Sequence, residues 1–201
     1  MTLRQPVYLV SVAVLVLVLG GALSGEKPAP RSKPKLAFVI QPRDLADHLH
    51  AVVAADREVY TRLVAGKLPK GPRAPGTAGP GENDAALPVP CQMLRLCDEA
   101  AQTRGAEFSY VLRAFAPLNG QNALETDVER KGLEWVSGHP QTNYYSEEML
   151  GGRRYFTGVY PDVARQQACL NCHPTRLDGT GRAAKLGDVM GAIVVRVPLE
   201  F

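Results

Sequence analysis

The 201-residue sequence predicts an α+β fold in which two helices precede an antiparallel sheet. Three patterns carry this prediction: helical periodicity of apolar residues from Pro42 to Lys67, strand-like alternation from Phe108 to Leu112, and a β-branched run that begins near Gly187. The length that remains after an N-terminal targeting segment suits one modest hydrophobic core. We therefore expect a single domain over residues 37–201.

Residues 1–24 are typical of a signal peptide or a membrane anchor. Arg4 precedes an uninterrupted apolar run, and small residues close the segment as they do before a signal-peptidase site. The stretch 7–23 is also just long enough to stay in the membrane, at about 20 residues per span. We expect an extracytoplasmic protein, either periplasmic or anchored at the outer side of the inner membrane, with residues 25–36 as a Pro/Lys-rich tether.

Two helices are expected before the first strand. In the first, Pro42–Lys67, the Leu and Val side chains fall on one narrow stripe, and the proline suits a first helical turn. On this wheel His48 lies at the edge of the stripe and is expected to look inward, whereas His50 lies opposite and should meet solvent. The Gly- and Pro-dense segment at about 67–88 predicts a flexible loop, and Pro90–Thr103 predicts a second amphipathic helix.

Three later segments are expected to form strands. Residues 107–117 alternate between large and polar side chains, which is the period of a strand. Residues 151–161 and 187–201 are rich in β-branched and aromatic side chains, and each begins with glycine. Helices followed by strands and loops indicate an antiparallel sheet.

The pentapeptide CLNCH at Cys169–His173 is the sequence motif that indicates a functional site. Two thiols separated by two residues on one helical turn can reach the two vinyl groups of one haem edge, while the adjacent imidazole lies beneath the iron. The motif therefore predicts one covalent haem c, with Cys169 and Cys172 as thioethers and His173 as the proximal iron ligand.

Three other interpretations of the motif stay open at this point. A structural zinc site would need two further ligands, and Cys91 and Cys97 are spaced more widely than in a usual zinc knuckle. A thioredoxin-like redox pair should stand where a strand opens into a helix, but the motif runs into Pro174 and a polar loop. A disulfide between the two motif cysteines would leave the histidine without a role.

Composition argues against two further classes of function. The net charge of +3 arises from 23 basic and 20 acidic residues spread along the chain, so the sequence has no electrostatic footprint for nucleic acid. No constellation of acid and base residues for substrate turnover can be picked out, and the sequence does not predict an enzyme.

Several cationic and phenolic side chains are candidates for contact with the haem propionates. A guanidinium binds a carboxylate through two parallel hydrogen bonds, so arginine suits this role. The alternative for each residue is a solvated helix or strand face. The candidates are Arg57, Tyr60, Arg153, Arg154 and Tyr155.

At this point the sequence resembles the haem-c PAS-like sensor family over about residues 37–200. The segments in family order are AADREVYTRLV, PCQMLRL, FSYVLRAFAPLNGQN, ETDVERKGLEW, GGRRYFTGVYPDVARQQACLNCHPT and KLGDVMGAIVVRVPL. The resemblance implies a PAS-like sheet flanked by helices, a long N-terminal helix and one covalent haem c. It also implies redox or gas sensing, or electron transfer as a small cytochrome c, with a redox partner protein or a small gas ligand as the partner.

In one branch of this family the sixth iron ligand is a cysteine thiolate from a helix upstream of the first strand. Counting back from the PLNGQN segment places this ligand within a residue of Cys91, whereas Cys97 would require a gap. The helical wheel instead favours Cys97, because Cys97 lies in the apolar stripe. We expect Cys91 and His173 as the iron ligands. The alternatives for the sixth position are Cys97, His48, His139, Met93, Met149 and Met190, or a position left open.

Overall fold

The computed structural model describes residues 40–65 and 87–200. The predictions for the targeting segment and the tether, and for the loop at about 67–88 except its last two residues, lie outside the described residues. In chain order the elements are α1 (Pro42–Leu63), α2 (Pro90–Gln102), β1 (Ser109–Arg113), the 3-10 turn η2 (Gly120–Asn122), α3 (Asp127–Gly138), β2 (Tyr144–Leu150), β3 (Arg153–Val163), α4 (Gln167–Cys172) and β4 (Val189–Pro198). Within the described ranges, no helix is long and apolar enough to cross a membrane.

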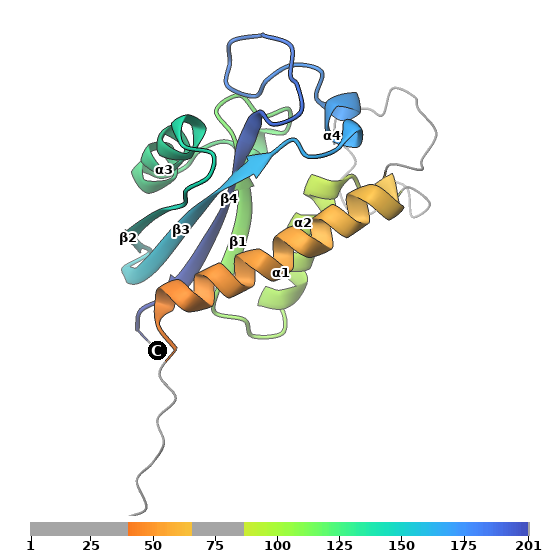
Figure 1. Cartoon of the computed structure of the whole chain (residues 1–201). Coiled ribbons are helices and arrows are strands. Elements are labelled where there is room, and N and C mark those ends of the chain that lie inside the picture. Colours follow the sequence, from red (N-terminus) through yellow and green to blue (C-terminus); the bar gives the residue numbers. More distant parts are fainter. Residues whose placement is uncertain (1–39, 66–86, 201) are drawn as a thin grey trace, which may run out of the picture. The chain divides into compact units, whose positions relative to one another are not determined.

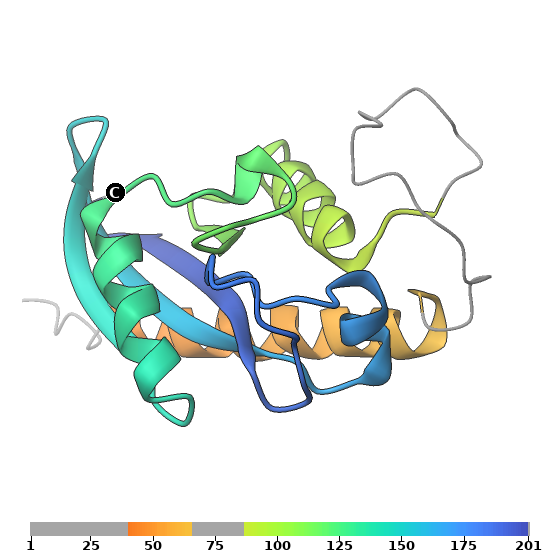
Figure 2. The ribbon, with the colours of Figure 1, turned by 90° about the horizontal axis from the view of Figure 1, so that it is seen from above.

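The four strands form one antiparallel sheet in the order β1-β4-β3-β2. Helices α1 and α2 cover one face and α3 covers the other, as the two views in Figures 1 and 2 show. The long central strands β3 and β4 pair along most of their length, from Tyr155 opposite Pro198 to Val163 opposite Val189. This arrangement confirms the predicted α+β, PAS-like class with helices around an antiparallel sheet and a long helix α1.

Strand β4 is buried on both faces because a helical layer lies on each side of the sheet. Ile193 and Val195 pack with side chains of α1 and α2, whereas Ala192 and Val194 pack with side chains of α3. Adjacent residues of a strand point to opposite faces, so one β-branched run contributes to both halves of the core.

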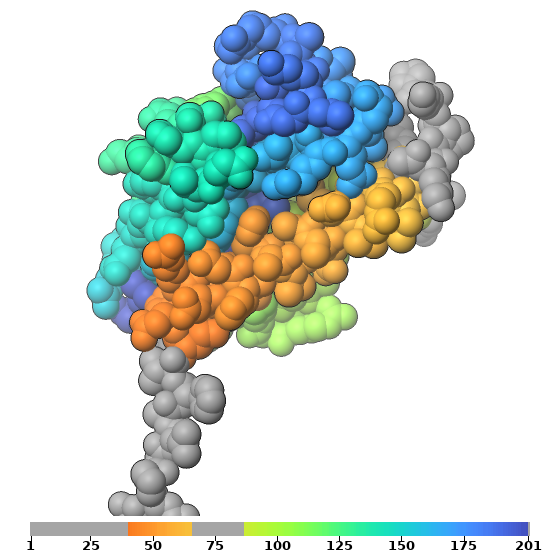
Figure 3. All heavy atoms as spheres, viewed as in Figure 1, coloured from red at the N-terminus to blue at the C-terminus, as the bar shows by residue number. Residues whose placement is uncertain are grey.

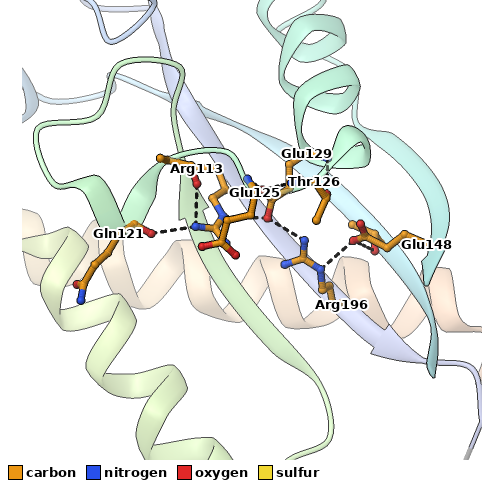
Figure 4. Close-up of polar contacts among 9 residues, drawn as sticks. Arg113, Gln121, Glu125, Thr126, Glu129, Glu148 and Arg196 are labelled. Carbon is orange, nitrogen blue, oxygen red and sulfur yellow. Dashed lines mark hydrogen bonds and ion pairs between the residues drawn. The ribbon is translucent and has the colours of Figure 1, made fainter. Parts of the chain in front are cut away.

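Helix α3 is joined to the sheet by a buried ionic cluster (Figure 4). The carboxylate of Glu129, which is fully buried, accepts hydrogen bonds from Arg113 on β1 at 2.8 Å and from Arg196 on β4 at 2.7 Å. Glu129 also completes the capping box of the helix with Thr126. Glu129 therefore helps to cap the N-terminal end of α3 and also joins the helix to two strands.

The sequence did not predict β2 or α3, and α1 ends at Leu63 rather than Lys67. Strand β2 lies at the edge of the sheet and keeps polar and charged side chains, so its apolar pattern is weak. The start of α3 does carry a sequence signal, the capping box formed by Thr126 and Glu129, which our sequence analysis did not use.

The predicted orientation of the two α1 histidines is wrong. His48 is exposed, whereas the ring of His50 stacks on that of Tyr160 with the ring centres 3.9 Å apart. The packed face of α1 is rotated away from the full Leu/Val stripe, and it includes the small residue Ala46 and the polar Thr61. On this face Arg57 also donates hydrogen bonds to Asp162 of β3.

Candidate functional site

The CLNCH motif lies on the short helix α4, directly after the end of β3 (Figure 1). Cys169 is half-buried and Cys172 is exposed, and both are free thiols. His173 caps the helix, and its backbone N–H donates to the carbonyl of Cys169 at 3.0 Å. The two thiols and the imidazole therefore come from one helical turn, as the motif predicts.

The imidazole of His173 is held in a neutral state by its surroundings. Burial lowers the pKa of His173, the positive charge of Arg57 lowers it further, and the negative charge of Asp162 acts in the opposite direction. A neutral imidazole has a free lone pair on one ring nitrogen, which is the form that binds a metal ion. The Nδ1 atom of His173 is buried and has no hydrogen-bond partner among the described residues.

Cys91 lies close to this motif although it is distant in sequence. It stands in the first turn of α2, and burial raises the pKa of its thiol. The positive charge of Arg57 and nearby backbone N–H groups act against this rise, whereas the motif cysteine Cys172 adds to it. Arg57 also interacts electrostatically with Cys169, so the charge of one guanidinium acts on the thiol of α2 and on one thiol of α4.

Cys97, the alternative ligand, lies elsewhere on α2. It is exposed, and its thiol contacts the sulfur of Met93 at 3.5 Å, within the same helix. The apolar wheel of α2 placed Cys97 inside, but Leu94 is the residue of this helix that is fully buried. Of the two cysteines, Cys91, which the count back from the PLNGQN segment favours, interacts electrostatically with the motif. Cys97, which the helical wheel favours, is exposed on α2.

Arg57 and Asp162 form a paired contact between α1 and β3 beside the motif. The two guanidinium nitrogens Nη1 and Nη2 donate to the two carboxylate oxygens at 2.5 and 3.0 Å. Burial alone would lower the pKa of Arg57, but the charge and hydrogen bonds of Asp162 raise it, so the arginine stays charged. The sequence predicted a binding role for Arg57 but none for Asp162, which stands in the YPDVA segment just upstream of the motif.

The other predicted propionate partners are divided between two places. Tyr60 lies one turn after Arg57 on α1, and its hydroxyl donates to the carbonyl of Pro88, just ahead of α2, at 2.6 Å. Arg153 and Tyr155 lie at the opposite end of β3, about 30 and 23 Å along the strand from Asp162 at about 3.3 Å per residue. The structure does not bring this second group to the motif.

Ion pairs account for the two arginines at that distant end. Arg153 pairs with Glu107 at 2.7 Å, and its guanidinium lies over the ring of Tyr155. Arg154 pairs with Glu200 at 2.7 Å. These contacts lie at the end of the sheet where β3 begins and β4 ends. Both arginine side chains are therefore already paired with acidic residues.

The remaining candidate iron ligands lie on several elements. His139 caps the C-terminal end of α3 and stacks on Trp135 of the same helix, with the ring centres 4.1 Å apart. Met149 is exposed on β2, and Met190 is buried in β4. Over residues 40–65 and 87–200, no group of three or more His, Cys, Asp and Glu side chains is arranged to hold a metal ion.

Figure 3 shows α1 as a long ridge, with the segment that carries the motif beside its C-terminal half. The site thus combines residues from four elements: Arg57 from α1, Cys91 from α2, Asp162 from β3, and the CLNCH motif from α4. It offers two thiols for covalent attachment, a neutral imidazole and a half-buried third thiol whose ionisation the arginine favours.

Comparisons with known proteins place the chain in a family. Among solved structures it is similar to the crystal structure of the cyanobacterial haem protein Tll0287, with 17% sequence identity and a TM-score of 0.47, covering 80% of this chain and 98% of that chain. No curated protein matches the sequence. A model of the Tll0287-like family matches residues 37–198, which is most of the chain. The protein therefore belongs to the Tll0287-like family.

Proposed function

We propose that this protein is an exported mono-haem c protein that senses redox state or a small gas. The observation that carries the proposal is the arrangement of the CLNCH motif: two free thiols on one helical turn, followed by the half-buried imidazole of His173, whose pKa is lowered by burial. Membership of a family named after a haem protein supports the binding of haem. Export, expected from residues 1–24, would bring the thiols to the compartment in which they meet haem.

The residues present fit a covalent haem. Cys169 and Cys172 would hold the porphyrin through thioether bonds, and His173 would ligate the iron through a ring nitrogen. The buried Nδ1 of His173 has no hydrogen-bond partner among the described residues, so no such bond at Nδ1 ties the ring to the rest of the chain, which supports a role as ligand. When bound, haem supplies an iron that exchanges one electron and takes two axial ligands.

Cys91 is the proposed second axial ligand. Its thiol is half-buried beside the motif, and the positive charge of Arg57 favours the thiolate against the effect of burial. An anionic thiolate lowers the potential of the iron, so this ligand favours the oxidised state. Reduction would weaken the hold of Cys91 and leave a position open to a gas.

Helix α2 connects this cysteine to the sheet. Cys91 stands in its first turn, while near its other end the carboxylate of Asp98 accepts a hydrogen bond from the backbone N–H of Tyr110 on β1 at 2.9 Å. Leu94 between them is buried in the core. A change of ligand at Cys91 would therefore act on a helix that is packed against the sheet, which is how the proposed sensor would pass on its state.

One observation favours the alternative function, a small electron-transfer cytochrome c. Cys172 is exposed, so the thioether on that side would bring the edge of the porphyrin near the surface, where a redox partner could approach. Such a carrier would keep both axial ligands through each cycle. Visible spectra of the oxidised, reduced and carbon monoxide-treated protein separate the two functions, because only the sensor loses Cys91 and binds the gas.

The haem itself is tested with protein made together with a cytochrome c maturation system. The purified protein should stay red after acid–acetone extraction and gain the mass of one haem. The double variant Cys169→Ala/Cys172→Ala should lose covalent haem, whereas Cys97→Ala, a cysteine outside the site, should retain it. Colourless wild-type protein that contains stoichiometric zinc would overturn the proposal.

Ligation by Cys91 has a separate test. Electron paramagnetic resonance of the oxidised protein should show a low-spin iron with a thiolate signature. Cys91→Ala should abolish that signature, and Cys97→Ala should preserve it. A Cys91→Ala protein with the wild-type spectrum would show that another side chain occupies the position.

A further inference from the structure

Two buried side-chain nitrogens of the described residues have no hydrogen-bond partner: Nε of Arg57 and Nδ1 of His173. Both belong to the same cluster, because Arg57 acts electrostatically on His173 and both lie near Asp162. A buried polar group without a partner costs about 1–3 kcal/mol, so such groups are rare in native proteins. Their coincidence at one place indicates that the cluster is completed when the site is loaded.

The chemistry of an iron-bound histidine defines what His173 needs. When one ring nitrogen ligates the iron, the other carries a proton and must donate it to an acceptor. Arg57 has only donors and cannot serve. A backbone carbonyl or a carboxylate could, and the carboxylate whose charge acts on this imidazole is that of Asp162. The two groups are not hydrogen-bonded in this structure, so the bond would form when the site is loaded.

Asp162 has the capacity to accept this bond. Its carboxylate offers about four lone-pair sites, of which Arg57 occupies two through one hydrogen bond to each oxygen. The paired geometry fixes the plane of the carboxylate. The side chain is only 11% exposed, so water competes weakly for the free lone pairs.

We propose that Asp162, held in place by Arg57, is the positioning residue of His173 and accepts the hydrogen bond from its Nδ1–H. The inference rests on the proposed haem function and specifies how the chain tunes that site. A carboxylate partner makes the imidazole a stronger donor and fixes the orientation of the ring. Both effects favour the oxidised iron, in the same direction as the thiolate of Cys91.

The pairing also explains why an arginine stands among these groups. Without Arg57, the carboxylate of Asp162 would be a largely buried negative charge beside an apolar helix–sheet interface. With Arg57 the pair is close to neutral, so Asp162 retains its capacity as an acceptor while the fold tolerates its burial. Because Arg57 comes from α1 and Asp162 from β3, the helix is part of the device that orients the histidine.

The test compares haem-loaded variants of the full chain. Asp162→Asn removes the charged acceptor, and the double variant Arg57→Gln/Asp162→Asn does so without leaving a guanidinium buried and unpaired, which protects folding. Asp47→Asn is the matched control, because Asp47 also joins α1 to the sheet, by accepting hydrogen bonds from Tyr145 and Tyr160 at 2.7 Å each. Two readouts are measured: the equilibrium between oxidised and reduced protein, and the iron–histidine stretching frequency of the reduced protein in a Cys91→Ala background.

Both Asp162 variants should be more reduced than wild type at a fixed ambient potential, and a tenfold change in this equilibrium corresponds to about 59 mV for one electron. Their iron–histidine frequency should fall, and the control should leave both readouts unchanged. Wild-type readouts in the haem-loaded double variant, or an equal shift in Asp47→Asn, would overturn the inference alone. Wild-type protein that carries no covalent haem would instead overturn the proposed function.

Discussion

Replacing Glu129 with glutamine should destabilise the protein strongly, although the side chain keeps its size and shape. One carboxylate oxygen of Glu129 accepts from both Arg113 and Arg196, and the other accepts from the backbone N–H groups of Glu125 and Thr126 at 2.6 and 3.2 Å. A glutamine amide has one acceptor and one donor end. Whichever way it turns, its NH₂ group faces two donors.

The magnitude follows from the burial of this cluster. Glu129 is 0% exposed, and the guanidinium groups of Arg113 and Arg196 are also largely buried. Removing one partner of a buried ion pair costs about 3–5 kcal/mol, because the remaining charge is left uncompensated. For a domain of this size the melting temperature should fall by about 10 °C.

The pH dependence gives a second signature. Burial would raise the pKa of Glu129, but the hydrogen bonds from Arg196 and from the Glu125 backbone, with the charges of both arginines, lower it below its ordinary value. The stabilisation from Glu129 is therefore complete above the pKa of the unfolded chain, about 4.3, and is lost as the pH falls through the lower folded value. The difference between wild type and variant should shrink in that acid window.

Urea denaturation at pH 7 and at pH 4 measures both effects. The matched control is Glu125→Gln, since Glu125 also pairs with Arg113, at 2.7 Å, but is 66% exposed, so its loss should cost no more than about 1 kcal/mol. Equal effects of the two substitutions at pH 7 would contradict the reasoning, because burial would then not decide the strength of the interaction.

Two further predictions concern packing and protonation. Gly132→Ala in α3 should destabilise the fold by about 1–3 kcal/mol in thermal unfolding, because the new Cβ would lie 2.6 Å from a methyl group of Val159; Gly138→Ala, with nothing within 4 Å, should not. His50 has its pKa lowered to about 4, chiefly by burial, so the unfolded chain takes up its proton first and stability should fall as the pH drops from about 6.5 to 4. His50→Phe should keep the stacking on Tyr160 and remove this part of the acid dependence, as the urea midpoint at pH 7 and pH 5 would show.

The sequence predicted the parts of the fold that depend on simple periodicity. The β-branched run of β4 and the alternation of β1 are strong signals because both strands are packed against helices. The CLNCH motif is local, so its spacing alone predicts that the two thiols and the imidazole come from one helical turn. The edge strand β2 was missed, since an edge strand tolerates polar residues and loses its pattern.

The rotation of α1 could not be predicted because polar contacts determine it. An apolar wheel turns Val52, Val59 and Leu63 inward, yet these side chains are 61%, 44% and 48% exposed. The helix instead turns Arg57 toward Asp162, and this bidentate contact requires one orientation of both side chains. A helical wheel uses only the positions of apolar residues and takes no account of ion pairs. It therefore gives the wrong orientation where a buried ion pair determines which face of the helix packs. The same limit applies to α2, where the wheel favoured Cys97, whereas Cys91 is the cysteine whose charge interacts with that of the motif. Functional sites are where local apolar patterns are expected to fail.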